Sequence, residues 1–370
     1  MDMILNTIHL VQYYVLPFVV VLGIMIFFHE LGHFLVAKYF GIKVLKFALG
    51  FGPPVVSKTI GETEYSIRYI PLGGFVKMLG EDIEDPDSPP EPRTPEEDAR
   101  AFDKQHPIKR MAVVVAGPAF NIVLSLLMFC GIYIISGKDV ILPEIGQVTD
   151  DSPAQRAGFI KGDLVASING VEIRSWTELK DCVKDKTGMP LSFVVKRDGK
   201  FLELTVTPEE TIIKNEFGED IKSSLIGIVA SNNQGKIELS PLDAIKEGFS
   251  ETYRWIEMTI LVVVKLFQGV VSIKTLGGPI LIGQMTGELA QQNLSYLLPF
   301  MAVISINLGI LNLFPIPILD GGLIVFLLLE LAIGRPLSIK KRELAQKVGL
   351  FLLILLMVVV FYNDISRLIR

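Results

Sequence analysis

Two histidines and a glutamate, in His29-Glu30-Leu31-Gly32-His33, lie inside a long apolar stretch of the chain. No Lys or Arg occurs between Leu10 and Ala37, so we expect this stretch to be a helix that spans a membrane. Residues four apart share one face of a helix, which lets both imidazoles bind one metal ion while Glu30 lies beside the water that it would activate. A charged group near the bilayer centre costs about 2.5 to 3.5 kcal/mol, so Glu30 needs a partner or an ion.

A third metal ligand has to come from elsewhere, because a catalytic zinc ion usually takes three protein ligands. Asp320 is the candidate, since it follows an uncharged stretch that begins at Asn293 and is expected at the same end of its span as His33. A metal would keep this carboxylate ionised. The alternative is a neutral Asp that is hydrogen-bonded in a broken helix. Two imidazoles and a carboxylate suit one zinc ion, but iron and cobalt accept the same ligands.

Pro315 and Pro317 interrupt the apolar segment just before Asp320. Unwound chain at membrane depth is tolerated where it is packed in protein or lines a wet cavity, and a hydrolase in lipid needs such a cavity. Asn312 is a candidate to hydrogen-bond the backbone of a substrate there.

Three other places are candidates for substrate contact or for helix packing. Asn307 contacts substrate or, by the interpretation that we favour, ties helices together. Asn121, in Gly117-Pro118-Ala119-Phe120-Asn121, either packs helices or orders the site or the substrate. The segment Gly50-Phe51-Gly52 would hold an unwound substrate by strand pairing.

The composition favours a membrane protein with a sizeable soluble portion. Half of the residues are hydrophobic and 20% are charged, and the net charge of -5 argues against a protein that binds nucleic acid. Cys130 is expected in lipid and Cys182 in water, so we do not expect them to form a disulfide.

Four apolar stretches are long enough to cross a membrane: residues 10–37, 111–136, 297–329 and 348–363. Clusters of Lys and Arg follow the first, precede the second and join the third to the fourth. Because basic residues favour the cytoplasmic side, these clusters orient the chain. We expect both termini and the region from about 137 to 296 on the outer side of a bacterial inner membrane, which is the periplasmic side.

The apolar stretch Tyr253–Val271 is a possible fifth span. Arg254, Glu257, Lys265 and Gln268 recur on one stripe at helical spacing, which favours an amphipathic helix lying on the membrane surface. A true crossing would also place the most basic loop outside.

The acidic, proline-rich segment that starts at Glu81 cannot bury a core, and we expect a flexible cytoplasmic loop that serves as a solvated tether. Tyr65, Ile67 and Tyr69 alternate with polar residues, which indicates a β-strand. This strand, the four spans and the acidic loop together divide the chain into segments. The expected divisions are 1–40, first transmembrane helix; 41–80, membrane-associated β-sheet; 81–106, flexible loop; 107–137, second transmembrane helix; 138–210, PDZ domain; 211–250, a following segment; 251–292, amphipathic surface helix and loop; 293–333, third transmembrane segment; and 334–370, cytoplasmic loop and fourth transmembrane helix.

The PDZ assignment rests on Ser152-Pro153-Ala154, Ala157-Gly158-Phe159 and Gly162-Asp163, which resemble the elements of PDZ domains in bacterial proteases. Residues 176–184 fit the helix of such a domain, and 191–196 and 201–207 fit strands around an Asp198-Gly199 turn. A PDZ groove adds a peptide strand to a sheet edge, or the domain acts only as a steric gate.

Together, His29–His33, Gly117–Asn121, the PDZ elements and Asn312–Gly322 resemble the site-2 protease family, close to its bacterial RseP type, over nearly the whole chain. The resemblance implies an α-helical polytopic membrane protein with a small β-sheet and a periplasmic PDZ domain. It implies an intramembrane zinc endopeptidase with His29, His33 and Asp320 as ligands of one zinc ion and Glu30 as the base that activates a zinc-bound water. Two departures are a single PDZ domain where close relatives have two, and Leu323 where a His often stands.

The resemblance further implies single-pass membrane proteins as substrates, already shortened by another protease, such as an anti-sigma factor, or remnant signal peptides. Two other classes of function are a membrane PDZ scaffold without activity and a transporter, which broken helices and intramembrane carboxylates would also fit. The presence of all four site residues argues against the scaffold, and the lack of detectable repeats argues against the transporter.

Overall fold

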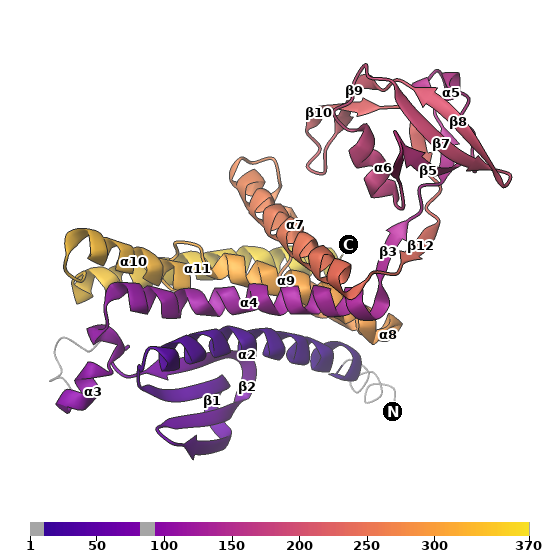
Figure 1. Ribbon diagram of the computed structural model, residues 1–370. Coiled ribbons are helices and arrows are strands. Elements are labelled where there is room, and N and C mark those ends of the chain that lie inside the picture. The colour runs from indigo at the N-terminus through magenta and orange to yellow at the C-terminus, as the bar shows by residue number, and fades with distance from the viewer. Residues whose placement is uncertain (1–10, 82–92, 370) are drawn as a thin grey trace. The chain divides into compact units, whose positions relative to one another are not determined.

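The computed structural model describes residues 11–81 and 93–369 of the chain (Figure 1). The chain forms two compact units, Met1–Ile132 with Lys246–Arg370, and Tyr133–Ile245. We call the first the helical unit and the second the sheet unit, and we describe each by itself.

The helical unit contains the long apolar helices and several short ones. In chain order, the helices that lie wholly or mostly in it are η1 (Val11–Val15), α2 (Leu16–Tyr39), α3 (Pro95–Ala99), η2 (Phe102–Lys104), α4 (Pro107–Ser136), α7 (Pro241–Phe267), η3 (Ile273–Thr275), α8 (Pro279–Gln292), η4 (Leu294–Tyr296), α9 (Leu297–Asn312), α10 (Asp320–Ile333) and α11 (Ile339–Ile369).

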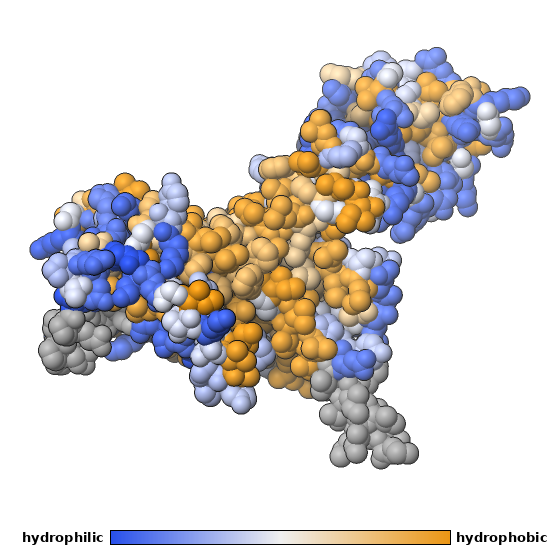
Figure 2. Space-filling view, turned by 60° about the horizontal axis from the view of Figure 1, so that its bottom comes forward, coloured by the Kyte–Doolittle hydropathy of each residue, from blue (hydrophilic) through white to orange (hydrophobic). Residues whose placement is uncertain are grey.

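Four helical segments among the described residues are long and apolar enough to cross a membrane: Gln12–Tyr39, Pro107–Ser136, Leu294–Asn312 and Ile339–Ile369. They overlap the four spans predicted from the sequence, although the third ends at Asn312 and not at the predicted residue 329. Figure 2 shows apolar residues covering the middle of the helical unit and hydrophilic residues gathered toward both of its ends. Such a surface requires lipid or an apolar partner. The stretch 253–271 is not among these segments, so its placement on the membrane surface stays a prediction.

The third predicted span is broken where the prolines indicated a break. α9 ends at Asn312, and α10 begins at Asp320. With 14 residues, α10 is about 21 Å long, which is shorter than the roughly 30 Å hydrocarbon core. The fourth helix, α11, has 31 residues and is longer than the predicted 348–363. The charged residues on both sides of the apolar run are also helical.

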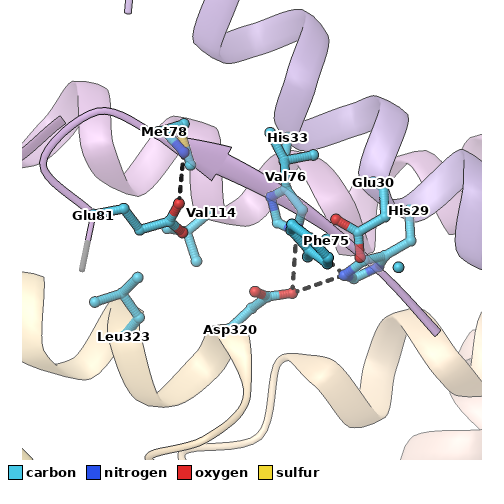
Figure 3. A pocket seen from close by; sticks show the side chains of 11 residues that line it. His29, Glu30, His33, Phe75, Val76, Met78, Glu81, Val114, Asp320 and Leu323 are labelled. Atoms are coloured by element: carbon cyan, nitrogen blue, oxygen red, sulfur yellow. Dashed lines mark hydrogen bonds and ion pairs between the residues drawn. The ribbon is translucent and has the colours of Figure 1, made fainter. Parts of the chain in front are cut away.

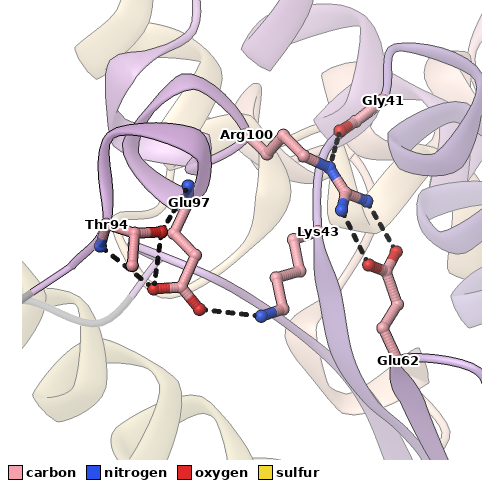
Figure 4. A network of polar contacts seen from close by, with 6 residues as sticks. All are labelled: Gly41, Lys43, Glu62, Thr94, Glu97 and Arg100. Carbon is pink, nitrogen blue, oxygen red and sulfur yellow. Dashed lines mark hydrogen bonds and ion pairs between the residues drawn. The ribbon is translucent and has the colours of Figure 1, made fainter.

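The predicted flexible loop 81–106 is ordered over its second half, which corrects that prediction. Residues 82–92 lie outside the described part of the chain. Thr94 caps α3 in a capping box with Glu97, and Phe102 is buried. Ion pairs hold this segment to the end of α2 and the sheet (Figure 4). The local composition predicts a tether because these partners are distant in sequence.

The predicted boundaries around the surface helix were also wrong. α7 begins at Pro241, where Ser240 caps it by accepting a hydrogen bond from the Asp243 N–H, so the helix starts inside the segment predicted as 211–250. The predicted loop before the third span contains α8. The side chain of Asp364 in α11 accepts hydrogen bonds from backbone N–H groups at the start of α8, including that of Gly278.

A bent hairpin of β1 (Val44–Ile60) and β2 (Thr63–Met78) forms the sheet of the helical unit. Ala48 pairs with Ser66 on one side and with Phe75 on the other, so the start of β1 lies between the two ends of β2. Residues 74–78 therefore form an edge that pairs only with β1 among the described strands.

This hairpin packs against α2 and α4 through one apolar core. Ala37, Ile42, Val44 and Val113 in it are completely buried. A partly buried ion pair adds a polar link between α4 and α10, because Arg110 Nη1 lies 3.0 Å from Glu330 Oε1. The core and this pair place α2, α4 and α10 around one point.

The sheet unit contains a four-stranded antiparallel sheet in the order β6-β5-β7-β8 with short helices. Its elements are β3 (Lys138–Ile141), β4 (Ile145–Val148), α5 (Pro153–Arg156), β5 (Leu164–Ile168), β6 (Val171–Glu172), α6 (Trp176–Val183), β7 (Leu191–Arg197), β8 (Lys200–Val206), β9 (Glu209–Lys214), β10 (Asp220–Leu225), β11 (Ile228–Ala230) and β12 (Gln234–Ile237). The helix and the two strands predicted for a PDZ domain are present. Asp198 and Gly199 both have positive φ, as the predicted hairpin turn requires.

The predicted end of this domain at residue 210 was wrong. β11 pairs with β4 and β12 pairs with β3, so the segment after β8 returns to the start of the same unit. These pairings join strands far apart in sequence, and no local pattern shows them.

Candidate active site

The two histidines of α2 lie one helical turn apart and point to the same place. Their Nε2 atoms are 3.2 Å apart, and His29 is buried. Apolar side chains cover the helix on all sides. His29, Glu30 and His33 are the exceptions in its central turns.

Asp320 meets this pair from the start of α10 (Figure 3). Its Oδ2 atom lies 3.1 Å from His29 Nε2 and 3.6 Å from His33 Nε2. This oxygen is buried and has no hydrogen-bond partner among the described residues. The histidine pair of α2 and Asp320 of α10 therefore meet, as the sequence predicts.

Two glycines allow the tight turn that presents Asp320. A Cβ at Gly321 would lie 2.2 Å from the carbonyl oxygen of Leu313, and one at Gly322 would lie 2.3 Å from that of Ile316. A larger residue at either position would push the turn away from the start of α10. In the Asp-Gly-Gly sequence, the aspartate thus offers a ligand atom, and the two glycines allow the backbone to pack closely.

Helix α4 supplies the surroundings of both imidazoles. His33 Nδ1 lies 2.9 Å from the Val113 carbonyl oxygen, and His29 Nδ1 lies 3.2 Å from Asn121 Nδ2. A Cβ at Gly117 would lie 2.3 Å from His33 Nε2 and 2.9 Å from His29 Nε2. The missing side chain of Gly117 leaves open the space in front of both nitrogens, a role that the sequence analysis did not assign.

These three side chains fit a zinc ion. His29, His33 and Asp320 each offer one ligand atom, and the atoms lie within 4.8 Å of one another. Zinc held tetrahedrally at about 2.0 to 2.1 Å keeps its ligand atoms about 3.3 Å apart, which is close to the separations found here. The unpartnered Oδ2 of Asp320 and the space that a Gly117 Cβ would fill support the same conclusion.

A pocket of about 190 Å³ adjoins this centre. Its lining comes from α2, α4, α10 and the edge of the sheet: His29, Glu30, His33, Gly74, Phe75, Val76, Met78, Glu81, Val114, Asp320 and Leu323. Glu30, the predicted base, thus shares the pocket with the candidate ligands. Leu323, noted as a departure from the family pattern, also lines it, and no ligand atom is lost with it.

The sequence analysis missed two parts of this lining. Glu81 accepts a hydrogen bond from the Met78 N–H at 2.9 Å and lies across the pocket from Glu30 (Figure 3). The strand edge at Gly74 packs directly on the site, because a Cβ there would lie 3.0 Å from Glu30 Cγ. The Gly73-Gly74 pair was a sequence signal for this close approach.

The residues predicted to contact substrate do not line this pocket. Gly50, Phe51 and Gly52 form a bend in β1 with positive φ at both glycines and are not among the lining residues. Asn312 at the end of α9 is not among them either. Asn121 is completely buried beside His29. Contact of these residues with substrate therefore stays a prediction. Asn307 accepts a hydrogen bond from the Thr259 hydroxyl, as expected of a residue that ties helices together.

Comparison with known proteins decides the family. The family model described as Peptidase family M50 matches residues 17–356. The chain belongs to peptidase family M50. The prediction of a zinc metalloprotease of the site-2 protease type is confirmed at this level.

Relatives of this M50 peptidase match it over almost their whole length. It is 34% identical over 421 residues to the zinc metalloprotease RasP of Geobacillus kaustophilus, covering 95% of this chain and 98% of that protein. It is 35% identical over 363 residues to an Agrobacterium fabrum protein named "Putative zinc metalloprotease Atu1380", covering 96% of both. Among solved structures, one match is the PDZ domain of an SdrC-like protein from Listeria monocytogenes. The match covers 24% of the M50 chain and 84% of the Listeria chain, at 24% identity and a TM-score of 0.20.

Proposed function

We propose that this chain is an intramembrane zinc endopeptidase, which hydrolyses a peptide bond within a transmembrane segment of another membrane protein. The observation that carries the proposal is the meeting of His29, His33 and Asp320 beside Glu30 in one pocket. The two histidines and Glu30 come from α2, which is one of the candidate spans, and α4, another of them, contacts both imidazoles.

The chain's own residues divide the chemistry between them. A zinc ion held by His29, His33 and Asp320 would supply a Lewis acid that polarises the scissile carbonyl and acidifies water. Glu30 accepts a proton from the attacking water, whose oxygen bonds to the carbonyl carbon. As the carbon–nitrogen bond breaks, Glu30 delivers this proton to the leaving amine, and two peptides result.

The edge of the sheet is suited to hold the substrate. A transmembrane helix hides its carbonyl groups in its own hydrogen bonds, so the scissile segment has to unwind first. Residues 74–78 pair with β1 on one side, and Gly74, Phe75 and Val76 line the pocket. An extended segment added to this edge would pass Glu30. We place the docking strand here rather than at Gly50-Phe51-Gly52.

The basic clusters support a placement in the membrane. Basic residues that follow α2 and precede α4, such as Lys43 and Lys109, support the cytoplasmic side of a bacterial inner membrane for these ends of the two helices. We place the sheet unit on the periplasmic side. The substrates that suit such an enzyme are single-pass membrane proteins already shortened by another protease, for example anti-sigma factors or remnant signal peptides.

Substitution of Glu30 by Gln tests the proposal. The E30Q protein should fold and keep its zinc, while cleavage of a model transmembrane substrate should fall by about 10² to 10⁴-fold, the usual contribution of a general base. E288Q on the exposed side of α8 is the matched control and should cleave normally. Cleavage by E30Q at the normal rate would remove Glu30 as the base, and wild-type protein without zinc would refute the metallopeptidase.

A further inference from the structure

The side chain of Asn121 leaves one buried polar atom unexplained. Asn121 is completely buried in α4, one turn after Gly117. Its Nδ2 lies 3.2 Å from His29 Nδ1, whereas its Oδ1 is buried and has no hydrogen-bond partner among the described residues. A buried carbonyl oxygen without a partner costs about 1 to 3 kcal/mol, so this arrangement needs a reason.

The nearby His33 shows what the site requires of an imidazole. The Val113 carbonyl oxygen, 2.9 Å from His33 Nδ1, can only accept a hydrogen bond. His33 Nδ1 therefore carries the hydrogen, and its Nε2 lone pair is free to face Asp320. A metal ligand held in this way has a fixed tautomer and a fixed ring plane.

His29 needs the same tautomer, because its Nε2 is the atom nearest to Asp320. If Nδ1 of His29 carries the hydrogen, the NH₂ group of Asn121 would face another donor. The oxygen and nitrogen ends of an amide have nearly the same shape, and which end is which follows from the hydrogen bonds. Rotating the Asn121 amide by about 180° brings Oδ1 to Nδ1 and pairs the orphaned oxygen.

We propose that Asn121 is a positioning residue that accepts a hydrogen bond from His29 Nδ1 and so keeps the Nε2 lone pair of His29 available to the metal. Helix α4 then orients both histidines, His33 through the Val113 carbonyl and His29 through the Asn121 side chain. This inference rests on the proposed zinc site and adds a group that determines how tightly the site holds its ion.

The neighbouring helix keeps Asn121 in place. The hydroxyl groups of Ser125, in α4 itself, and of Ser305, in α9, each donate to the backbone carbonyl oxygen of Asn121 at 2.9 Å. A Cβ at Gly309 would lie 2.9 Å from the Pro118 carbonyl oxygen and 3.4 Å from Asn121 Cβ, so α9 packs tightly against this turn of α4. These contacts hold the backbone and Cβ of Asn121, and rotation about the Cβ–Cγ bond exchanges the two ends of the amide without moving either.

Zinc affinity of two variants tests the role. Asn121→Leu removes the acceptor at similar volume and should weaken zinc binding by about 10- to 100-fold, as is usual when the hydrogen bond that orients a ligand is lost. Asn121→Asp keeps an oxygen toward His29 and should stay within about threefold of the wild type, because acceptor chemistry is what the position requires. Competition with a chromophoric chelator measures both values.

Asn363→Leu is the matched control, since it makes the same change at a buried Asn in α11, whose Nδ2 donates to the Ile273 carbonyl oxygen. It should leave zinc affinity unchanged. Wild-type affinity in N121L, or equal weakening in N121D and N121L, would overturn the proposal.

A second measurement needs no substitution. In zinc-loaded protein with ¹⁵N-labelled histidine, the Nδ1 proton of His29 should resonate downfield and exchange slowly, as that of His33 should. A fast-exchanging His29 proton beside a protected His33 proton would contradict the hydrogen bond. Failure of wild-type protein to bind zinc would instead refute the proposed function, so the two failures are distinguishable.

Discussion

At the scale of single residues, glycine decides how closely α4 approaches the histidine pair. A Cβ at Gly32 would lie 2.3 Å from the Ala116 carbonyl oxygen, and one at Gly117 would meet both imidazole Nε2 atoms. The backbone of α4 thus stands where a side chain would otherwise block the ligand atoms. This is why a site built from helix side chains can be both buried and open to an ion.

Substitution of Gly117 by Ala should therefore destroy the metal site without unfolding α4. The new methyl group would collide with His33 Nε2 at 2.3 Å, and we expect zinc retention and cleavage to fall at least as far as the roughly 10- to 100-fold seen when ligand orientation is disturbed. Zinc per purified chain and helix content by circular dichroism measure the two effects.

Gly131→Ala in the same helix is its control, because a Cβ there meets nothing within 4 Å. Ala is favoured over Gly in a helix by about 0.5 to 1 kcal/mol, so this variant should keep zinc and be at least as stable. Full zinc content in G117A would show that α4 does not pack as described.

At the scale of elements, charged side chains attach the 93–106 segment to the end of α2 and to the sheet (Figure 4). Glu62, in the turn between β1 and β2, accepts hydrogen bonds from Arg100 at 2.8 and 2.7 Å and from Lys38 at 2.6 Å. These bonds, from Arg100 first and Lys38 second, lower the pKa of Glu62 from 4.5 to about 2. The attachment therefore depends on an ionised Glu62.

The contribution of Glu62 to stability should disappear in acid. Because its pKa is lower in the folded chain, its stabilisation is complete above about pH 4.5 and is lost as the pH falls toward about 2. The network is partly exposed, so we expect only about 1 kcal/mol at neutral pH. The Tm of E62Q should lie about 1 to 2 °C below that of the wild type at pH 7, and the two should converge toward pH 2.

E288Q serves again as the control and should follow the wild-type Tm throughout this pH range. A Tm difference between E62Q and the wild type that stays constant from pH 7 down to about pH 2 would contradict the role of an ionised Glu62.

The sequence predicted the features that depend on neighbouring residues, and it missed those that depend on contacts between distant parts of the chain. The spans and the break before Asp320 rest on apolar runs and on Pro315 and Pro317, which are local. The attachment of 93–106 rests on pairs such as Lys43 with Glu97, which are 54 residues apart, and composition alone shows only an acidic tether. The end of the sheet unit rests on β11 and β12 returning to β4 and β3, which is equally non-local.

The site shows the same division. His29, Glu30, His33 and Asp320 could be found because buried charge needs a partner and metal ligands come in known sets. The role of Gly117 could not, because a glycine in an apolar helix carries no chemical signal, and at the strand edge the Gly73-Gly74 pair signals only a close approach of the backbone. Their roles emerge from distances to His33 Nε2 and Glu30 Cγ.

At the scale of the whole molecule, the proposed orientation makes a prediction about access from each side of the membrane. Lys161 in the sheet unit and Lys104 in η2 are both exposed. With Cys130 and Cys182 replaced by Ser, a membrane-impermeant maleimide should label K161C in spheroplasts and K104C only in inverted vesicles. The opposite result would reverse the orientation, and labelling of both in spheroplasts would refute the membrane arrangement.

The proposed function depends above all on one cation held between α2 and the start of α10. X-ray absorption at the zinc edge, with metal quantification of wild-type protein and of Asp320→Ala, tests this directly. We expect one zinc ion per wild-type chain with nitrogen and oxygen ligands at about 2.0 to 2.1 Å, two of them imidazoles, and a large loss of zinc in D320A. A wild-type chain without zinc, or a D320A chain with the same zinc content and spectrum, would contradict the metal centre.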